Sequence, residues 1–180
     1  MIKLKKPHLG ISSCLLGEKV RYDGRQLQNR YITDSLEKYF AWIPVCPEVE
    51  YGLGIPREAM HLVGNPAKPR LVEISTGIDH TDGMLKWVAK KLAELEKEDL
   101  CGFIFKSKSP SSAIRGVKII SASGVECTEG PGIFGGAFTK RFSLIPVIDD
   151  EQFGDPISRN SFLEKVFARK KLRDPKEKDR

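Results

Sequence analysis

Two cysteines stand beside residues that could take part in chemistry. Cys14 ends the segment Gly-Ile-Ser-Ser-Cys, and Cys46 begins the segment Cys-Pro-Glu, whose carboxylate is Glu48. Free cysteine is among the most buried residue types, so a core thiol is the simplest interpretation of Cys14 taken alone. A nucleophile and a metal ligand are the alternatives, because thiolates are nucleophilic and also bind zinc and iron–sulfur species.

A third polar segment supplies hydroxyl groups. The apolar run at 102–105 leads into Lys-Ser-Lys-Ser-Pro-Ser-Ser, which contains Ser109 and ends at Ser112. The glycine-rich segment at 130–137 lacks the Gly-Lys-Ser ending of a phosphate loop. It is expected to bring a helix N-terminus close to the site, where the helix dipole favours an anion. The histidines show no triad spacing and there is no Cys-x-x-Cys pair, so a histidine-assisted hydrolase and a zinc ribbon have no support.

The elements that must position these residues alternate between strands and helices. Apolar runs without alternation predict strands at 9–13, 41–45, 102–105 and 144–148. Helices are predicted at 33–40, 81–95, 130–141 and 158–169. A further strand or arm is predicted at 70–74, and a hairpin at 117–120 and 124–127. This order predicts a single α/β domain with a mainly parallel sheet that helices cover on both faces.

The carboxyl ends of parallel strands share one edge of a sheet, where ligands bind. Cys14, Cys46, Glu48 and the serine-rich segment all follow predicted strands, so we expect them to converge at that edge. Cys101 precedes its strand and is expected to be a buried thiol at the opposite edge, about 15–20 Å away at a rise of about 3.3 Å per residue. Cys127, on the predicted hairpin, is the remaining thiol that could reach the site.

Composition places the chain among globular domains. It has 180 residues, 40% of them hydrophobic, and no apolar stretch approaches the roughly 20 residues of a membrane span. Without the apolar run of a secretory signal, we expect a cytoplasmic protein whose four cysteines are thiols or ligands rather than disulfides. The net charge is +6, and residues 169–180 hold seven basic residues against three acidic ones. We divide the chain into a domain at 1–168 and a basic mixed-charge tail at 169–180, which is either a solvated end or a weak contact to RNA.

Four spaced motifs carry a resemblance to a known family. They are GISSCLLGEKVRYDG at 10–24, PVCPEVEYGLGIPRE at 44–58, KSKSPSSAIRG at 106–116 and GPGIFGGAF at 130–138. Through them the chain resembles, from residue 9 to 167, the bacterial thiouracil desulfidase family, formerly a domain of unknown function. That family also occurs fused to a second domain in tRNA 4-thiouridine desulfidases. The resemblance implies a Rossmann-like, three-layer α/β fold that carries a [4Fe-4S] cluster on three cysteines, with the fourth iron open to sulfur.

The motifs assign expected roles to six residues. These are the cluster ligands Cys14 and Cys46, the catalytic residues Glu48 and Ser109, and the substrate contacts Ser13 and Ser112. The implied reaction is a non-redox desulfuration, in which an open iron captures the sulfur and water attacks the ring carbon with the help of a base. The implied substrate is a thiolated pyrimidine, either thiouracil or 4-thiouridine, free or in tRNA, and no membrane partner is expected.

The serine-rich segment departs from the family pattern. Related sequences usually read Ser-Pro-Ser-Cys at this point and use the cysteine as a cluster ligand, whereas this chain has Ser112. A serine oxygen is a hard ligand and a poor replacement for a thiolate. Three interpretations stay open: a cluster on Cys14, Cys46 and an unusual third ligand, a different metal, or a non-catalytic nucleotide- or RNA-binding module that keeps the fold.

Overall fold

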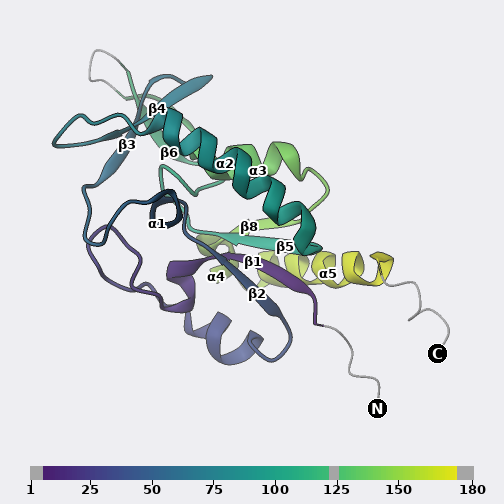
Figure 1. The fold of residues 1–180 in the computed structure, drawn as a ribbon. Helices are drawn as coiled ribbons and strands as arrows, with labels where there is room; N and C mark the ends of the chain where they lie inside the picture. Colours follow the sequence, from purple (N-terminus) through teal and green to yellow (C-terminus); the bar gives the residue numbers. More distant parts are fainter. Residues whose placement is uncertain (1–5, 122–125, 174–180) are drawn as a thin grey trace, which may run out of the picture.

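A four-stranded parallel sheet forms the centre of the molecule. The computed structural model describes residues 6–121 and 126–173, with the backbone alone at 126 and 127. The strand order is β2-β1-β5-β8, and the strands are β1 (His8–Ser12), β2 (Ala41–Val45), β5 (Leu100–Phe105) and β8 (Val147–Asp149) (Figure 1). All three pairings are parallel, so the carboxyl ends of the strands lie along one edge.

Both faces of this sheet are buried, which explains why its strands lack alternation. All six residues of β5 are buried, and their side chains enter two separate cores. Phe103 and Phe105 pack on the face covered by α2 (Thr81–Leu95) and α3 (Ile133–Arg141). Ile104 packs on the other face, which α5 (Pro156–Arg173) covers. The α/β fold with a parallel sheet between two helical layers is therefore confirmed.

A second four-stranded sheet was not predicted as a unit. Its order is β4-β3-β6-β7, and its strands are β3 (Met60–Asn65), β4 (Lys68–Glu73), β6 (Val117–Ile120) and β7 (Glu126–Gly130). The β3–β4 and β6–β7 pairs are antiparallel and the β3–β6 pair is parallel, so the sheet is mixed. The sequence of β3, MHLVGN, has no sustained apolar run, and for this reason the hydrophobic pattern missed it. The turn expected within the hairpin at 122–123 lies outside the described residues.

Several element boundaries differ from the expectations. The first strand ends at Ser12, and a 3-10 turn, η1 (Ser13–Leu16), begins at the next residue. The helix expected at 33–40 is a short π-helical segment, η2 (Tyr31–Leu36). Two short helices, α1 (Pro47–Tyr51) and α4 (Asp150–Gly154), were not predicted, because helices of five residues carry too little periodicity to detect.

The last helix is longer than predicted. It continues past residue 169 to Arg173, and its last turn is basic, which suits the negative end of the helix dipole. Arg169 donates hydrogen bonds to the carbonyl oxygens of Leu100 and Leu144, both at 3.1 Å, and Arg173 pairs with Asp99. The positive charge at 169–173 therefore belongs to a helix that is bonded to the body of the domain.

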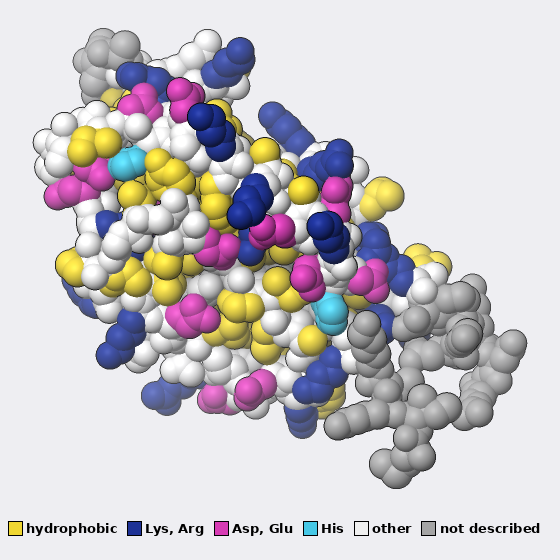
Figure 2. All heavy atoms as spheres, in the orientation of Figure 1, with side chains coloured by type: hydrophobic (Ala, Val, Ile, Leu, Met, Phe, Trp, Pro, Cys, Tyr) yellow, Lys and Arg dark blue, Asp and Glu magenta, His cyan; other side chains and the backbone are white. Residues whose placement is uncertain are grey.

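The surface carries both signs of charge. Figure 2 shows basic and acidic side chains interspersed on the face that carries α2. The net charge of +6 accordingly produces no single-sign field on this face. No helix in the described part of the chain has both the length and the apolar character needed to cross a membrane.

Candidate functional site

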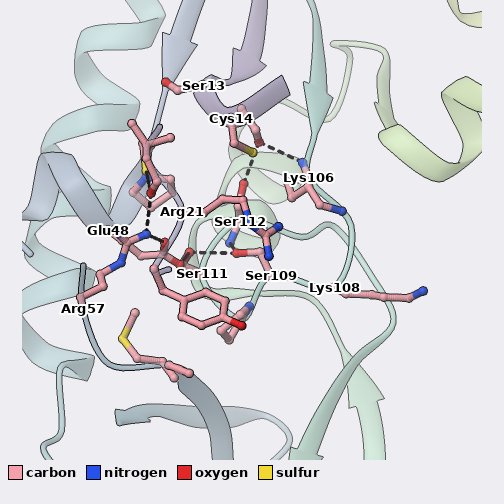
Figure 3. A pocket seen from close by; sticks show the side chains of 18 of the residues that line it. Ser13, Cys14, Arg21, Glu48, Arg57, Lys106, Lys108, Ser109, Ser111 and Ser112 are labelled. Atoms are coloured by element: carbon pink, nitrogen blue, oxygen red, sulfur yellow. Dashed lines mark hydrogen bonds and ion pairs between the residues drawn. The ribbon is translucent and has the colours of Figure 1, made fainter. Parts of the chain in front are cut away.

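A cavity of about 420 Å³ lies at the carboxyl ends of β1, β2 and β5 (Figure 3). The residues predicted to act there all line it: Ser13, Cys14, Cys46, Glu48, Ser109 and Ser112. The chain runs from β1 outward to β2 and then returns to β5 on the other side of β1. The cavity thus lies where the strand order reverses, which is the usual ligand site of open α/β sheets. The structure brings all six residues to one place.

Cys14 is the second residue of the turn that follows β1. Its side chain reaches the cavity and also packs with Leu15 and Ile11 in the core. Burial raises the pKa of the Cys14 thiol to about 12, and the nearby positive charge of Lys106 opposes this rise. A thiol of this kind stays protonated at neutral pH unless a metal ion displaces the proton.

Cys46 lies between β2 and the short helix α1, which it caps. Its Sγ donates a hydrogen bond to the carbonyl oxygen of Val20 at 3.9 Å. Burial raises the pKa of this thiol too, and hydrogen bonds from the backbone N–H groups of Val49 and Glu48 oppose the rise. Pro47 occupies the first helical position, where its missing N–H group costs nothing. The Cys-Pro-Glu sequence therefore starts a helix at the end of the strand.

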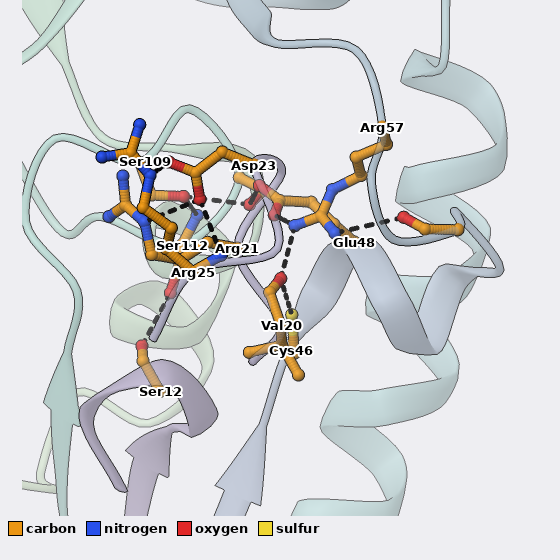
Figure 4. A network of polar contacts seen from close by, with 12 residues as sticks. Ser12, Val20, Arg21, Asp23, Arg25, Cys46, Glu48, Arg57, Ser109 and Ser112 are labelled. Atoms are coloured by element: carbon orange, nitrogen blue, oxygen red, sulfur yellow. Dashed lines mark hydrogen bonds and ion pairs between the residues drawn. The ribbon is translucent and has the colours of Figure 1, made fainter. Parts of the chain in front are cut away.

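The Glu48 carboxylate is held from two sides. Its Oε2 pairs with the guanidinium of Arg57, which also donates to the Val20 carbonyl oxygen at 2.8 Å (Figure 4). Its Oε1 accepts a hydrogen bond from Ser111 Oγ at 2.6 Å. The Arg57 side chain is 5% exposed, so the ion pair is shielded from solvent and fixes the carboxylate in one orientation. Because Val20 also accepts the bond from Cys46, one network joins the thiol to the carboxylate.

The serine-rich segment is shaped by the N-terminus of α3. The N–H groups of Phe134 and Gly132 donate to the carbonyl oxygens of Ser111 and Ala113, at 2.7 and 2.8 Å. At Gly135 an added Cβ would lie 2.2 Å from the Ala113 oxygen, so only glycine permits this close approach. The helix N-terminus lies close to the site, and the N–H groups of Gly132 and Phe134 already bind the segment itself, so any anion favoured by the helix dipole would need other donors.

Hydroxyl groups connect this segment to β1. Ser109 Oγ accepts a hydrogen bond from the Ser112 N–H group at 3.0 Å and lies 3.1 Å from Ser111 Oγ. Ser112 Oγ lies 3.0 Å from Ser12 Oγ, and Ser12 Oγ accepts a further bond from the Lys106 N–H group at 2.9 Å. These contacts fix the position of the Ser112 oxygen at the end of β1.

A second ion pair joins Lys106, which lines the cavity, to Asp150. Asp150, the first residue of α4, accepts hydrogen bonds from Lys106 Nζ at 2.9 Å and from the Ser107 N–H group at 2.6 Å. Burial acts to raise the pKa of Asp150, but these two hydrogen bonds and the charge of Lys106 lower it overall. The Asp150 carboxylate therefore stays ionised and holds the Lys106 side chain beside the cavity.

Sequence reasoning assigned no role to Arg57, Lys106 and Ser111, which line the cavity. It also missed Asp150, which pairs with Lys106. Arg57 follows Glu48 by nine residues across a loop, and Asp150 follows the last strand, so no spacing rule links either of them to the cysteines. Ser111 lies inside the serine-rich segment, and only the structure shows that it is completely buried.

The described residues fit an iron–sulfur cluster at two positions out of three. Cys14 and Cys46 are the two thiols in the cavity, and the third position holds Ser112. Cys101 is buried near the start of β5, away from the cavity as expected, and the side chain of Cys127 lies outside the described residues. No group of three or more His, Cys, Asp or Glu within the described ranges could hold a metal ion. Among the described side chains, a cluster held by three thiolates therefore lacks one ligand.

Comparison with known proteins agrees with these features. The profile of the 2-thiouracil desulfurase family matches residues 9–150, which include all six predicted site residues. None of the curated proteins matches the chain. Among solved structures, the [4Fe-4S]-dependent thiouracil desulfidase TudS (DUF523Vcz) is 25% identical and superposes with a TM-score of 0.63, over 87% of this chain and 99% of that chain. The chain thus belongs to the 2-thiouracil desulfurase family.

Proposed function

We propose that this protein removes the sulfur atom from a thiolated pyrimidine and replaces it with oxygen. The observation that carries the proposal is the convergence of two thiols, Cys14 and Cys46, and one carboxylate, Glu48, on the cavity of a 2-thiouracil desulfurase fold. We further propose that the two thiols hold a [4Fe-4S] cluster, as the TudS structure is named for one. Such a cluster would supply an iron atom that binds the substrate sulfur.

The wall of the cavity suits a small, flat, polar ring. Tyr22, Val45 and Met60 offer apolar contacts, while Ser109 and Ser112 offer hydroxyl groups. The volume of about 420 Å³ lies within the range of small-molecule sites. The substrates that we propose are thiouracil and 4-thiouridine. The 4-thiouridine is either a free nucleoside or a nucleotide within tRNA.

The reaction is a hydrolysis without net electron transfer. Water adds to the ring carbon, the carbon–sulfur bond breaks, and sulfur leaves as hydrosulfide while the oxygen atom of water remains as the carbonyl oxygen. Glu48 holds an acceptor atom beside the cavity, and in this proposal it orients the water and receives its proton, while Ser109 holds the substrate. Ser13 and Ser112 contact the substrate.

Anaerobic purification followed by incubation with 2-thiouracil or 4-thiouridine tests this proposal. We expect uracil or uridine and hydrosulfide to form in equal amounts, and iron and acid-labile sulfide to copurify with the protein. Cys46→Ala should remove the metal and the activity together, because Cys14 would then be the single thiol among the described residues of the cavity. Protein that holds iron and sulfide yet leaves both substrates unchanged would contradict the proposal.

A binding module without desulfurase chemistry is the second candidate. Ser112 favours it, because a hydroxyl replaces the thiolate at the third ligand position. In that case the anaerobically purified protein is colourless, binds a nucleotide or RNA with salt-sensitive affinity and releases no sulfide. The same experiment thus separates the two candidates.

We also propose a cytoplasmic location and a functional domain at 1–168, from which α5 continues to Arg173. Cys14, Cys46 and Cys101 are free thiols, and a reducing compartment preserves such thiols. Every residue that lines the cavity lies within the proposed domain.

A further inference from the structure

We infer that Glu48 and Ser111 fix the hydroxyl of Ser109 as a hydrogen-bond acceptor toward the cavity, so that the site selects rings with an N–H group beside the reacting carbon. The inference rests on the proposed function and deepens it, because it names a chemical feature that the substrate must carry. It follows from the directions of three hydrogen bonds, which can be worked out in order from the carboxylate.

The direction of the chain of hydrogen bonds is set at the Glu48 end. An ionised carboxylate accepts hydrogen bonds and donates none, and the buried guanidinium of Arg57 pairs with Oε2. Ser111 Oγ, 2.6 Å from Oε1, must therefore be the donor in that contact. A serine hydroxyl has a single proton, so Ser111 has none left for another partner.

The donor role of the Ser109 hydroxyl follows from that of Ser111. Its Oγ lies 3.1 Å from Ser111 Oγ, and since Ser111 has no second proton, Ser109 is the donor between them. Ser109 Oγ also accepts the bond from the Ser112 N–H group at 3.0 Å. A hydroxyl oxygen has two acceptor positions, so one of them is left over. Within the described ranges no other protein donor bonds to this oxygen, and the Ser109 side chain lines the cavity (Figure 3).

The remaining acceptor position decides which rings bind well beside Ser109. A ring N–H group can donate to it, whereas a methylated ring nitrogen cannot and leaves the oxygen without a partner. Both 2-thiouracil and 4-thiouridine carry the N3–H group directly beside the C=S carbon. Donation from N3–H would therefore place the reacting carbon next to Ser109 and close to Glu48. Sites that are built to hydrogen-bond a substrate group reject analogues without it.

Binding of uracil, N3-methyluracil and C5-methyluracil to the full-length protein tests the inference by calorimetry. These compounds resemble the reaction product and contain no sulfur, so their dissociation constants are measured without turnover. We expect uracil and the C5-methyl compound to bind alike, and the N3-methyl compound to bind about tenfold more weakly. The C5-methyl compound controls for the added volume of a methyl group.

Glu48→Gln provides a variant of the same size that reverses the chain of hydrogen bonds. Arg57 will hold the amide oxygen of the new side chain, which turns its NH₂ group toward Ser111. Ser111 must then accept that bond and donate to Ser109, whose own proton becomes free to face the cavity. The preference for uracil over the N3-methyl compound should therefore fall severalfold toward equality. Ser111→Ala also releases the Ser109 proton and should reduce the preference in the same direction.

Ser107→Ala is the matched control, because it removes a buried hydroxyl from the same segment that bonds to Lys106 rather than to Ser109. Loss of the preference in Glu48→Gln and Ser111→Ala, with retention in Ser107→Ala, supports the inference.

Equal binding of uracil and the N3-methyl compound by the unaltered protein, or no binding of either, overturns it. A preference that Glu48→Gln leaves intact also overturns it, because the discrimination would then be steric. Sulfide release from 2-thiouracil is measured separately, so the proposed function stands or falls independently.

Discussion

At the scale of single residues, Ser112 is where this chain departs from the chemistry that its motifs imply. Its oxygen is bonded to Ser12, and Ser12 is bonded to the backbone of Lys106, so the position is ordered and faces the cavity. Geometry at this position is thus compatible with a ligand, whereas the atom type is not the one that an iron–sulfur cluster prefers. We therefore expect the residue type at this position to limit cluster binding.

Ser112→Cys should raise the iron and acid-labile sulfide content several-fold after anaerobic reconstitution. The physical reason is that it supplies a third thiolate at an ordered position in the cavity. Ser107→Cys is the matched control, since it adds a thiol to the same segment at the residue whose N–H group bonds to Asp150. An unchanged iron content in Ser112→Cys, or an equal gain in the control, would show that position 112 does not limit the cluster.

Cys14→Ala should abolish metal binding and leave the fold intact. Cys101→Ala is its control, because Cys101 is an equally small, buried thiol that lies away from the cavity. Each substitution should lower the free energy of unfolding by about 1–3 kcal/mol, as expected for truncation of a buried side chain. Iron content separates them: we expect none in Cys14→Ala and an unaltered amount in Cys101→Ala. Equal iron in both variants would make Cys14 a packing residue only.

The Cys14 thiol also predicts a pH dependence for the metal-free protein. Burial raises its pKa from 9.0 to about 12 in the folded state. Below pH 9 the thiol is protonated in both states, whereas from pH 9 to about 12 the unfolded state loses the proton first, so stability falls as pH rises. In urea unfolding over this range, we expect a steeper loss for the unaltered protein than for Cys14→Ala. Parallel curves would refute the shift.

At the scale of elements, the start of α3 determines the shape of the serine-rich segment. Backbone N–H groups of Gly132 and Phe134 bind carbonyl oxygens of that segment, and the segment in turn presents Ser111 to Glu48. The helix thus acts through backbone contacts. Glycine is required at Gly132 and Gly135, because an added Cβ there would meet main-chain atoms of the segment.

Gly135→Ala should displace the serine-rich segment and reduce turnover. The new Cβ would lie 2.2 Å from the Ala113 oxygen and 2.5 Å from the Ser112 oxygen, so the backbone must shift. We expect a loss of about 1–3 kcal/mol in the free energy of unfolding, together with weaker binding of uracil. Gly154→Ala is the control, because nothing lies within 4 Å of its added Cβ. Similar losses in both variants would mean that the close approach carries no strain.

At the scale of the whole molecule, the cavity depends on the arrangement of two sheets. The parallel sheet contributes the ends of β1, β2 and β5, while Met60, the first residue of β3, and Arg57, in the segment that leads into that strand, line the cavity from the side of the second sheet. An aromatic cluster of α3 and β5 lies behind this arrangement, with Phe138 at 4.9 Å from Phe103 and 5.2 Å from Phe105 between ring centroids.

Phe138→Ala should lower the free energy of unfolding by about 3–5 kcal/mol, because it removes a fully buried ring from this cluster and leaves a void. Ile157→Ala is the control, since Ile157 is 80% exposed and should change stability by no more than about 0.5 kcal/mol. Urea unfolding monitored by circular dichroism measures both. A loss below about 1 kcal/mol for Phe138→Ala would show that the cluster contributes little to holding α3 on the sheet.

The sequence by itself determined the parallel sheet, its helical layers and the meeting of Cys14, Cys46 and Glu48. Strands buried on both faces must be apolar throughout, and residues that follow parallel strands must lie at one edge of the sheet. Both rules depend on the residue types within a short segment of the chain, so they can be applied to the sequence alone. For the same reason two elements escaped prediction: α1, which has five residues, and β3, whose sequence has no sustained apolar run.

Only the tertiary structure decided how the groups in the cavity are connected. The contact between Ser111 and Glu48 joins residues 63 positions apart, and the contact between Ser112 and Ser12 joins residues 100 positions apart. The pairing of Arg57 with Glu48 likewise depends on a loop that folds back over α1 rather than on spacing. Hydrogen bonds have direction, and a hydroxyl can donate or accept until its partners are known. The side chains present at the site were therefore readable from the sequence, whereas their protons and pairings followed from contacts that no local pattern encodes.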